Sequence, residues 1–388
     1  MAKSPLFGRR IHIAGSISDD LTVASAEEVG RARELVEMLV KDLLQKGATF
    51  VIPVDDEKLR PSDNLPICFD WLMWDTIHKN IQSRPENAPS PLVIAVKHHK
   101  NEEQIPEQFA GLWDSLCGSA LVQIESAAHW NMNSKRMEVQ ARSGDILIAL
   151  GGGEGIQFLA NLYHDAGKPV IPLNFKLGAP DKGAARLFEY GKVGSHAQRL
   201  FQTKADITPH NWINQIDFPA RIKVADRVQK LLDLLEALVP PTAFVIRLLN
   251  QKHADYDDVQ NFFDAVVKPV IEDELGYKLT VVDGEQKYEH ARIDQEIFSK
   301  LHRSRIVLAD ITGLRPNCFL ELGYALGRSL PTMLLAKEGT EHPFDILSLS
   351  GLHWKTTGTV EERRKAFRKH WNAIKNRPPL VPTEPLIP

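Results

Sequence analysis

Residues 305–327 read RIVLADITGLRPNCFLELGYALG, an apolar strand followed by a loop and a mostly apolar helix. Asp310 ends the strand, and Glu321 is the one charged residue between Arg315 and Arg328. An apolar strand that leads directly into a helix is typical of a parallel sheet covered by helices on both faces. In open sheets of this kind, ligands bind beyond the carboxyl ends of the strands. The stretch therefore predicts an α/β fold with Asp310 and Glu321 near its binding edge.

The two carboxylates are candidate functional groups because of where they stand. A carboxylate on an apolar helix loses hydration, and its pKa tends to rise. Two alternative interpretations remain open. Glu321 could be a structural carboxylate bonded to a neighbouring backbone amide, and Asp310 could simply cap the loop after its strand.

The same alternation of apolar strands and helices runs through the whole chain. Strands are predicted at 10–15, 48–53, 91–96, 144–150, 168–173, 243–249, 279–283, 306–310 and 331–336. Helices are predicted at 26–46, 156–166, 222–238, 258–275, 293–302 and 360–375, with irregular structure and short helices over 178–218.

The Pro240-Pro241 dipeptide is the best candidate for a domain boundary, because proline stops the preceding helix and stiffens the joint. We therefore expect two Rossmann-like or flavodoxin-like parallel-sheet domains in tandem, over residues 8–238 and 241–376, followed by a proline-rich tail over 377–388.

The composition is that of an ordinary globular protein. The 388 residues carry a net charge of -3, which gives no general reason to expect nucleic-acid or membrane partners. Three scattered cysteines are too few for a disulfide framework or a metal site. Because no signal peptide or membrane-spanning apolar run is found, we expect a cytoplasmic protein. We expect no bound metal and no cofactor.

Two glycine turns mark the first predicted domain. The first strand ends in Gly15-Ser16, and Gly151-Gly152-Gly153-Glu154-Gly155 joins a later strand to a helix. Such turns let backbone amides approach an anion, and the start of the helix adds a favourable dipole. A nucleotide or phosphorylated sugar would suit them; the alternative is that they serve only as tight joints. Candidate cations for the phosphate, which are otherwise exposed surface residues, are Arg9, Arg10, Lys135, Arg136 and Arg142.

Residues 13–16, 144–155 and 167–172 resemble the SLOG superfamily, whose Rossmann-like domains are related to the lysine-decarboxylase-like cytokinin-activating enzymes. Those enzymes carry a Pro-Gly-Gly-x-Gly-Thr turn followed by a catalytic glutamate. Here Leu150 replaces the proline, Ile156 replaces the threonine, and the helix that follows has no glutamate. The resemblance therefore implies the other role of the superfamily, which is to sense a nucleotide-derived signal in bacterial conflict systems. It implies a signal-binding site at Gly15, Ser16, Gly151, Gly152, Gly153, Glu154 and Gly155.

The run from Ala309 to Ala325 resembles the nucleoside 2-deoxyribosyltransferase-like and TIR-like domains, which cleave N-glycosidic bonds of nucleosides or NAD. In the transferases the glutamate of Glu-Leu-Gly-Tyr-Ala is the nucleophile, which corresponds to Glu321. Their upstream aspartate has no counterpart in the loop 314–317, so the resemblance favours hydrolysis over transfer.

Cleavage of an N-glycosidic bond passes through an oxocarbenium-like centre, which a carboxylate can stabilise or capture. Nicotinamide leaves as a neutral molecule, so one carboxylate is more plausible with NAD than with a purine nucleoside. The expected substrate-binding residues are Arg247, Asp310, Thr312 and Asn317. For Arg247 a surface ion pair is the alternative, and Asn317 could instead cap its helix. Tyr288, His290, His353 and Trp354 are interpreted as packing residues.

We therefore expect an antiphage-type effector that acts as a homo-oligomer. A nucleotide second messenger bound by the first domain would activate cleavage of NAD, as a substrate and not a cofactor, by the second. The alternatives are a nucleoside or nucleotide N-glycosidase, a deoxyribosyltransferase, or a nucleotide-binding signalling module without catalysis.

Overall fold

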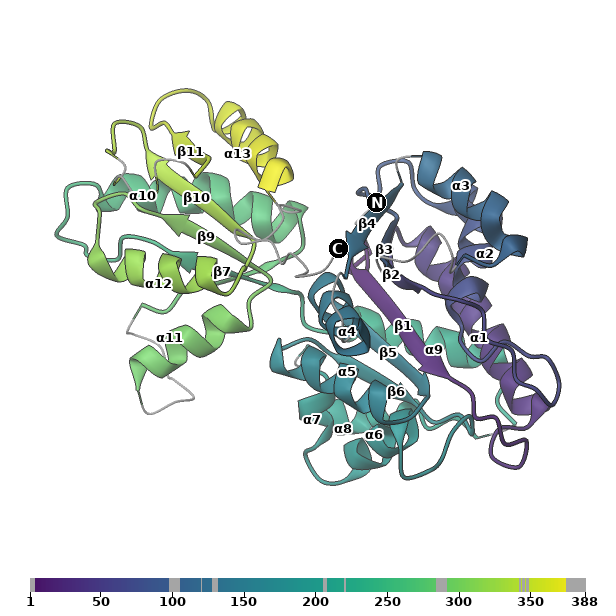
Figure 1. Cartoon of the computed structure of the whole chain (residues 1–388). Coiled ribbons are helices and arrows are strands. Elements are labelled where there is room, and N and C mark those ends of the chain that lie inside the picture. Colours follow the sequence, from purple (N-terminus) through teal and green to yellow (C-terminus); the bar gives the residue numbers. More distant parts are fainter. Residues whose placement is uncertain are drawn as a thin grey trace. The chain divides into compact units, whose positions relative to one another are not determined.

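The chain forms two compact units that meet at Val239 and Pro240, called here the N-terminal and the C-terminal unit (Figure 1). The computed structural model describes residues 4–97, 105–119, 121–127, 132–204, 208–219, 221–283, 292–341, 343, 346 and 349–374. The predicted tail at 377–388 lies outside the described residues.

The N-terminal unit is built on a six-stranded parallel sheet with the order β4-β3-β2-β1-β5-β6. Its strands are β1 (Arg10–Ser16), β2 (Thr49–Val54), β3 (Val93–Lys97), β4 (Val122–Ser126), β5 (Ile146–Gly151) and β6 (Val170–Leu173). Its helices are α1 (Ala26–Gln45), α2 (Asp70–Asn80), α3 (Ala110–Gly118), α4 (Met132–Ser143), α5 (Glu154–Asp165), α6 (Gly183–Lys192), α7 (Ala197–Leu200), α8 (Pro209–Gln215) and α9 (Val224–Ala237). The chain moves outward from β1 to β4 and then returns to the other side of β1, so the strand order reverses between β1 and β5.

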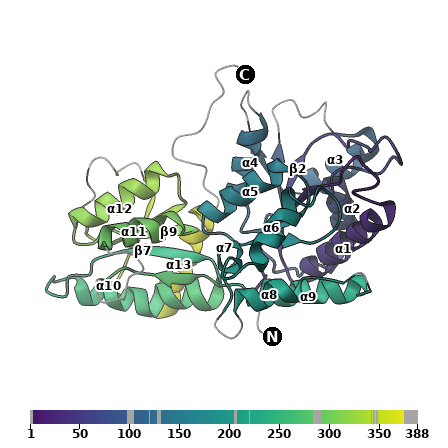
Figure 2. The ribbon, with the colours of Figure 1, turned by 90° about the horizontal axis from the view of Figure 1, so that it is seen from below.

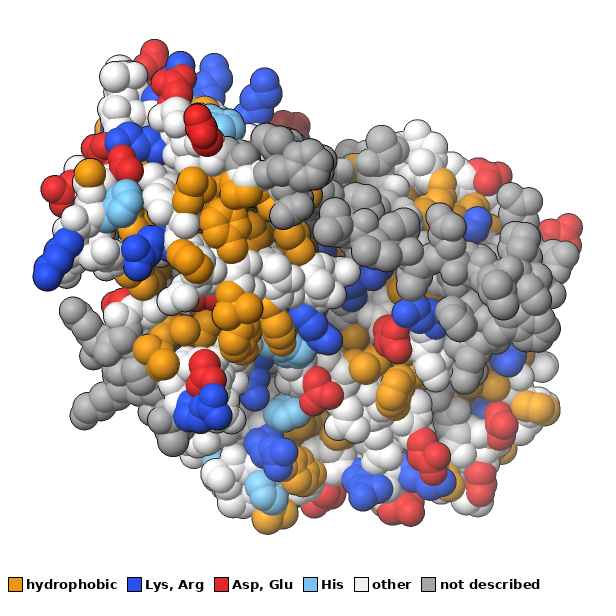
Figure 3. All heavy atoms as spheres, turned by 60° about the vertical axis from the view of Figure 1, so that its left-hand side comes forward, with side chains coloured by type: hydrophobic (Ala, Val, Ile, Leu, Met, Phe, Trp, Pro, Cys, Tyr) orange, Lys and Arg blue, Asp and Glu red, His pale blue; other side chains and the backbone are white. Residues whose placement is uncertain are grey.

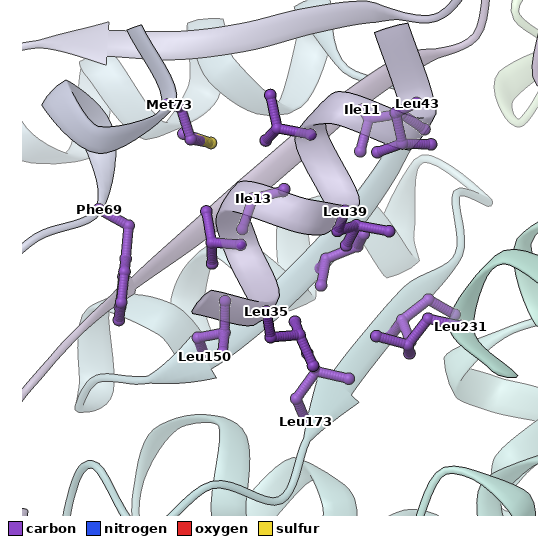
Figure 4. Packing of buried hydrophobic residues seen from close by; sticks show 14 of the residues in the cluster. Ile11, Ile13, Leu35, Leu39, Leu43, Phe69, Met73, Leu150, Leu173 and Leu231 are labelled. Atoms are coloured by element: carbon purple, nitrogen blue, oxygen red, sulfur yellow. The ribbon is translucent and has the colours of Figure 1, made fainter. Parts of the chain in front are cut away.

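Both faces of this sheet are covered. On one face α1, α2 and α9 pack on alternate residues of β1 and β2. Figure 4 shows Leu35, Leu39 and Leu43 of α1 lying along Ile11 and Ile13 of β1. On the other face α4 and α5 cover the residues of opposite parity. This is why the strands read as continuous apolar runs.

The C-terminal unit has a five-stranded parallel sheet with the order β11-β10-β9-β7-β8. Its strands are β7 (Thr242–Ile246), β8 (Lys278–Thr280), β9 (Ile306–Asp310), β10 (Thr332–Lys337) and β11 (Gly351–Trp354). Its helical segments are α10 (Tyr256–Phe262), η4 (Phe263–Val267), η5 (Pro269–Glu274), α11 (Ile293–His302), α12 (Pro316–Gly327) and α13 (Val360–Ile374). Helices α11 and α12 cover one face, and α10 and α13 cover the other (Figure 2). Here the strand order reverses between β7 and β9.

The predicted fold class, α/β with two parallel sheets in tandem, is confirmed. Two strands were not predicted from the sequence. β4 is an edge strand with partly exposed polar residues, and β11 has only four residues. Within the described residues, no helix is both long enough and apolar enough to cross a membrane.

The helix predicted over 258–275 is present but is wound differently. After α10 it continues as two π-helical segments, η4 and η5, on either side of Lys268. Pro269 has no backbone N–H to donate to the carbonyl of Ala265, as an α-helix would require. That carbonyl instead accepts a bond of 2.9 Å from Nε of Arg364 on α13. The side chain of Arg364 therefore supplies the hydrogen bond to a backbone carbonyl near the proline.

Candidate functional site

Glu321 lies on the flank of α12. Cys318, Leu322 and Ala325 form the buried face of this helix, and Glu321 is partly buried beside them. Burial raises the pKa of the Glu321 carboxyl to about 7. Within the described residues, the carboxylate has no hydrogen bond and no ion pair, so the structural interpretation of Glu321 as an amide-bonded group finds no support there.

Two leucines on and just before this helix are exposed. Leu314 is 43% exposed and Leu320 is 64% exposed. Figure 3 shows apolar side chains gathered on the visible surface of the C-terminal unit. Burial away from water disfavours the ionised form of a carboxyl group, which agrees with the raised pKa of Glu321.

Asp310 lies beneath the site and is bonded through both carboxylate oxygens. Its Oδ1 accepts from the backbone N–H of Thr312 at 2.9 Å, and its Oδ2 accepts from Nε1 of Trp354 at 2.7 Å. Burial raises the pKa of Asp310 to about 6, although the bonds from Thr312 and Trp354 oppose the shift. Asp310 therefore holds the loop after β9 to the strand β11.

Thr312 is also engaged within the protein. Its side chain is 1% exposed, and its Oγ1 accepts a bond of 2.9 Å from the backbone N–H of Lys337 at the end of β10. Asp310 and Thr312 thus fix this edge of the sheet through bonds within the protein.

Arg247 follows β7 directly, at the point where the strand order reverses. Because Ile246 pairs with Ala309, Arg247 lies level with Asp310. Its guanidinium stands 5.1 Å from the centre of the Phe263 ring. Burial lowers the pKa of Arg247, and its buried Nε has no hydrogen-bond partner among the described residues. Within the described residues, Arg247 forms no surface ion pair, so that alternative finds no support there.

His253 is a site residue that the sequence did not reveal. The backbone N–H of Asp255 donates to its Nδ1 at 3.2 Å, so a neutral His253 ring carries its proton on Nε2. The ring lies against Gly313, which has a φ of +80°; a Cβ there would come within 3.1 Å of Cε1 and Nε2. The loops after β7 and β9 therefore meet through His253. In the sequence, Gly313 was the one feature that could have indicated this contact.

Asn317 is exposed at the second position of α12. The N-cap of the helix is Arg315, so the alternative that Asn317 caps this helix is wrong. His353 is exposed on β11, whereas Trp354 is buried and stacks on Phe262 with ring centres 4.5 Å apart. Tyr288 and His290 lie outside the described residues.

In the N-terminal unit, the two glycine turns lie side by side. Ser16 pairs with Gly151 across β1 and β5, and the N–H of Gly152 donates to the carbonyl of Ser16 at 2.8 Å. A Cβ at Gly15 would lie 1.7 Å from the carbonyl oxygen of Leu150, so this crossing requires glycine. Gly153 is the N-cap of α5, and the first amides of that helix have no intrahelical acceptor.

A polar cluster that the sequence did not reveal lies beside these turns. The N–H of Ile17 donates to the carbonyl of Ile67, and Ser16 forms an isolated bridge with Cys68. Asp70 follows as the first residue of α2, and burial raises its pKa to about 7. Within the described residues, no hydrogen bond to its carboxylate is found.

Arg136 of α4 faces this cluster. Its Nη1 donates to Oδ2 of Asp55, which follows β2, at 2.5 Å. The charge of Arg136 opposes the rise in the pKa of Asp70, and that of Asp55 adds to it. Of the predicted cations, Arg136 is thus the one at this edge that meets the polar cluster. Arg9 and Arg10 stand where β1 begins, at the opposite edge from the glycine turns, so their predicted role as phosphate ligands is wrong.

Arg60 fixes the loop that carries Ser18. Its side chain is fully buried, donates to the carbonyls of Ser18 and Ala24 at 3.1 and 2.7 Å, and pairs with Asp63. This contact between the loops after β1 and β2 positions the edge of the sheet.

No group of three or more side chains suited to a metal ion is found in the described part of the chain. The comparison with curated proteins gives no match. Among solved structures, the X-ray structure of TM1055, a structural genomics target, is 14% identical, and the match covers 44% of this chain and 76% of that one. Its TM-score of 0.26 is too low to support an argument. The family model described as "ATP nucleosidase Cap17-like, N-terminal" matches residues 6–235, more than half of the sequence, and the chain therefore belongs to that family.

Proposed function

We propose that the chain is a nucleosidase-type effector that cleaves the N-glycosidic bond of a nucleotide, with Glu321 as the catalytic carboxylate. The observation that carries the proposal is the state of Glu321: partly buried, unbonded within the described residues, and with a pKa near 7. A carboxylate kept from water and from protein partners is available to a reacting centre.

In the proposed reaction the bond between C1′ of the ribose and the ring nitrogen breaks, and its electron pair leaves with the base. The ionised Glu321 stabilises the positive charge at C1′ or bonds to it, and a water molecule then supplies the hydroxyl group. The proton of that water goes to the departing adenine anion or, when neutral nicotinamide leaves, to solvent. Arg247 and the Nε2–H of His253 are the groups we assign to the phosphates, because both are donors at the reversal point of the sheet.

ATP and NAD are the two candidate substrates between which an experiment must decide. The description of the family names ATP nucleosidases, which favours ATP. Glu321 is the one carboxylate that we assign to the reacting centre among the described residues, and this favours NAD, because nicotinamide leaves as a neutral molecule without a proton donor. Donors for phosphate favour either nucleotide over an unphosphorylated nucleoside.

The N-terminal unit is proposed to bind a nucleotide signal at Ser16 and at the start of α5. Such a signal can activate the chain only if it binds the active arrangement more tightly than the inactive one. We propose that the active form is a homo-oligomer and that its role is defence against phage. An increase in molar mass by light scattering on addition of cyclic nucleotides would support this regulatory part.

The test is release of adenine from ATP and of nicotinamide from NAD by the purified chain, with and without a panel of cyclic nucleotides. Glu321→Gln is expected to lower the rate by a factor of roughly 10²–10⁴. It should retain stabilisation by the substrate in thermal unfolding.

Glu338→Gln is the matched control, because Glu338 is an exposed residue of the same unit that pairs with Lys355 at 3.0 Å. Equal rates for wild type and Glu321→Gln would overturn the catalytic assignment. Binding of nucleotides with no release of base under any condition would favour the signalling module without catalysis.

A further inference from the structure

The strand β4 forms one edge of the sheet in the N-terminal unit and has no part in the proposed cleavage. We propose that β4 pairs in antiparallel fashion with β4 of a second copy of this chain, so that two six-stranded sheets join into one. This inference rests on the homo-oligomer proposed above, and it adds the surface through which two copies meet.

The first argument is the set of backbone groups that β4 turns outward. The carbonyl of Leu121 accepts from the N–H of Val93 on β3 at 3.1 Å, and the N–H of Ala127 donates to the last carbonyl of β3 at 2.8 Å. Residues of odd number therefore face β3 with their N–H and C=O groups. The residues that turn these groups away from the sheet are Val122, Ile124 and Ser126. Among the described residues, no further strand or loop is found to bond them.

The second argument is that the outward groups are symmetric about Ile124. In an antiparallel pair centred there, Ile124 exchanges two hydrogen bonds with the same residue of the second copy, and Val122 does so with Ser126 of that copy. All three outward residues are then used, and the pair has the two-fold symmetry that is commonest among oligomers. Ile124 is 47% exposed, so its side chain gains burial in this pair.

The third argument is the match between side chains in the same register. Nε2 of Gln123 donates to Oε1 of Glu125 at 2.7 Å, so both side chains lie on one face of β4. In the proposed pair, Gln123 stands opposite Glu125 of the second copy, at a position where cross-strand side chains are close. An amide donor therefore meets a carboxylate acceptor twice, once on each side of the two-fold axis. Arg142 of α4, at 3.7 Å, offsets the charge of Glu125.

The fourth argument is a comparison with β6, the opposite edge of the same sheet. The carbonyl of Pro169 faces β5, because it accepts from the N–H of Leu147 at 3.0 Å. By alternation Pro172 belongs to the outward set of β6, and it has no N–H to offer. Proline and lysine are residues that protect an edge strand from pairing. β4 contains neither, which indicates an edge that is free to pair.

The experiment measures the association of the full chain by light scattering and analytical ultracentrifugation, with and without the panel of cyclic nucleotides. Wild type is expected to reach at least twice the mass of one chain. Gln123→Glu is expected to weaken association by about tenfold or more, because it places two like charges opposite each other on each side of the axis. The double variant Gln123→Glu/Glu125→Gln again places an amide opposite a carboxylate and should associate as wild type does.

A second pair of variants tests the backbone of β4. Ile124→Pro removes the N–H at the centre of the proposed pair and is expected to abolish association. It keeps the bonds between β4 and β3, because that N–H points away from the sheet. Ile124→Thr retains the N–H and a β-branched side chain, so it is the control and should still associate. Circular dichroism of each variant checks that the fold is retained.

Two outcomes would overturn the inference. One is an oligomer that Gln123→Glu and Ile124→Pro leave unchanged, which would keep the proposed homo-oligomer but place its contact elsewhere. The other is a chain that stays monomeric under every condition, which would remove the proposed oligomer as well. Release of base by the same preparations is measured separately, so failure of the catalytic proposal would be seen independently.

Discussion

Glu321 and Asp310 show how two carboxyl groups with the same perturbation can differ in role. Burial raises the pKa of both. Asp310 is enclosed and accepts two hydrogen bonds, whereas Glu321 has none in the described part of the chain. Hydrogen-bonding partners, more than the pKa, therefore separate the framework residue from the candidate catalytic residue.

Removing the charge of Glu321 is expected to stabilise the chain above neutral pH. Its folded-state pKa of about 7 lies above the ordinary value of 4.5, so folding takes up a proton between these values. The folded state therefore loses stability as the pH rises through that range. Glu321→Gln should raise the free energy of unfolding at pH 8 by about 1–2 kcal/mol, after allowance for partial exposure.

Urea unfolding of both proteins at pH 8 and pH 5 checks this, with a smaller gain expected at pH 5. A variant less stable than wild type at pH 8 would show that Glu321 is a structural group. A gain in stability together with a loss of activity is expected where a functional group is held in an unfavourable environment.

Trp354→Phe tests the support of Asp310. Phenylalanine keeps the stacking on Phe262 but leaves Oδ2 of the buried Asp310 without its donor. The expected cost is about 1–3 kcal/mol of unfolding free energy. Chemical denaturation measures it, with His353→Phe as the control because His353 is exposed on the same strand. Equal effects of the two changes would contradict the assigned role of the indole N–H.

At the scale of elements, the segment from Tyr256 to Glu274 shows a local geometry that the apolar pattern of the sequence does not predict. The apolar period correctly indicates a helix packed on the sheet, with Phe262, Val266 and Val270 buried. The period cannot reveal the π-helical winding, which depends on the proline at 269 and on a partner about a hundred residues away.

Arg364→Met is expected to destabilise the C-terminal unit by about 1–3 kcal/mol, because it leaves the carbonyl of Ala265 without a side-chain donor. Methionine keeps much of the apolar stem of the arginine. Lys365→Met, at an exposed position of the same helix, is the control and should change little. Differential scanning calorimetry of the two variants gives the comparison; a matching loss in both would implicate charge and not the bond.

At the scale of the whole chain, both units follow one rule. The candidate groups gather where the order of a parallel sheet reverses, between β1 and β5 in one unit and between β7 and β9 in the other. The positions of Glu321 and of the glycine turns could be predicted because each is a local signal, an isolated charge or a run of glycines beside an apolar strand. Their roles stay predictions.

The other contacts of the two candidate sites could not be predicted, because they join residues that are far apart in the sequence. Asp55, Asp70 and Arg136 come from three separate elements, and only the fold brings them together. His253 likewise meets Gly313 across two loops that are far apart in the sequence. Burial, which sets the pKa values of Asp70 and Glu321, is also a property of the folded chain and not of a motif.

The bond between Trp354 and Asp310 has a consequence for synthesis of the protein. β11 is the last strand of its sheet to leave the ribosome, yet the indole of Trp354 on this strand holds the Asp310 carboxylate beneath the candidate site. Domains fold as units, the N-terminal one first during translation. The nascent C-terminal unit therefore cannot complete this edge until β11 has emerged, so the cleavage activity that we propose would be withheld from the cell until translation of the fold is nearly finished.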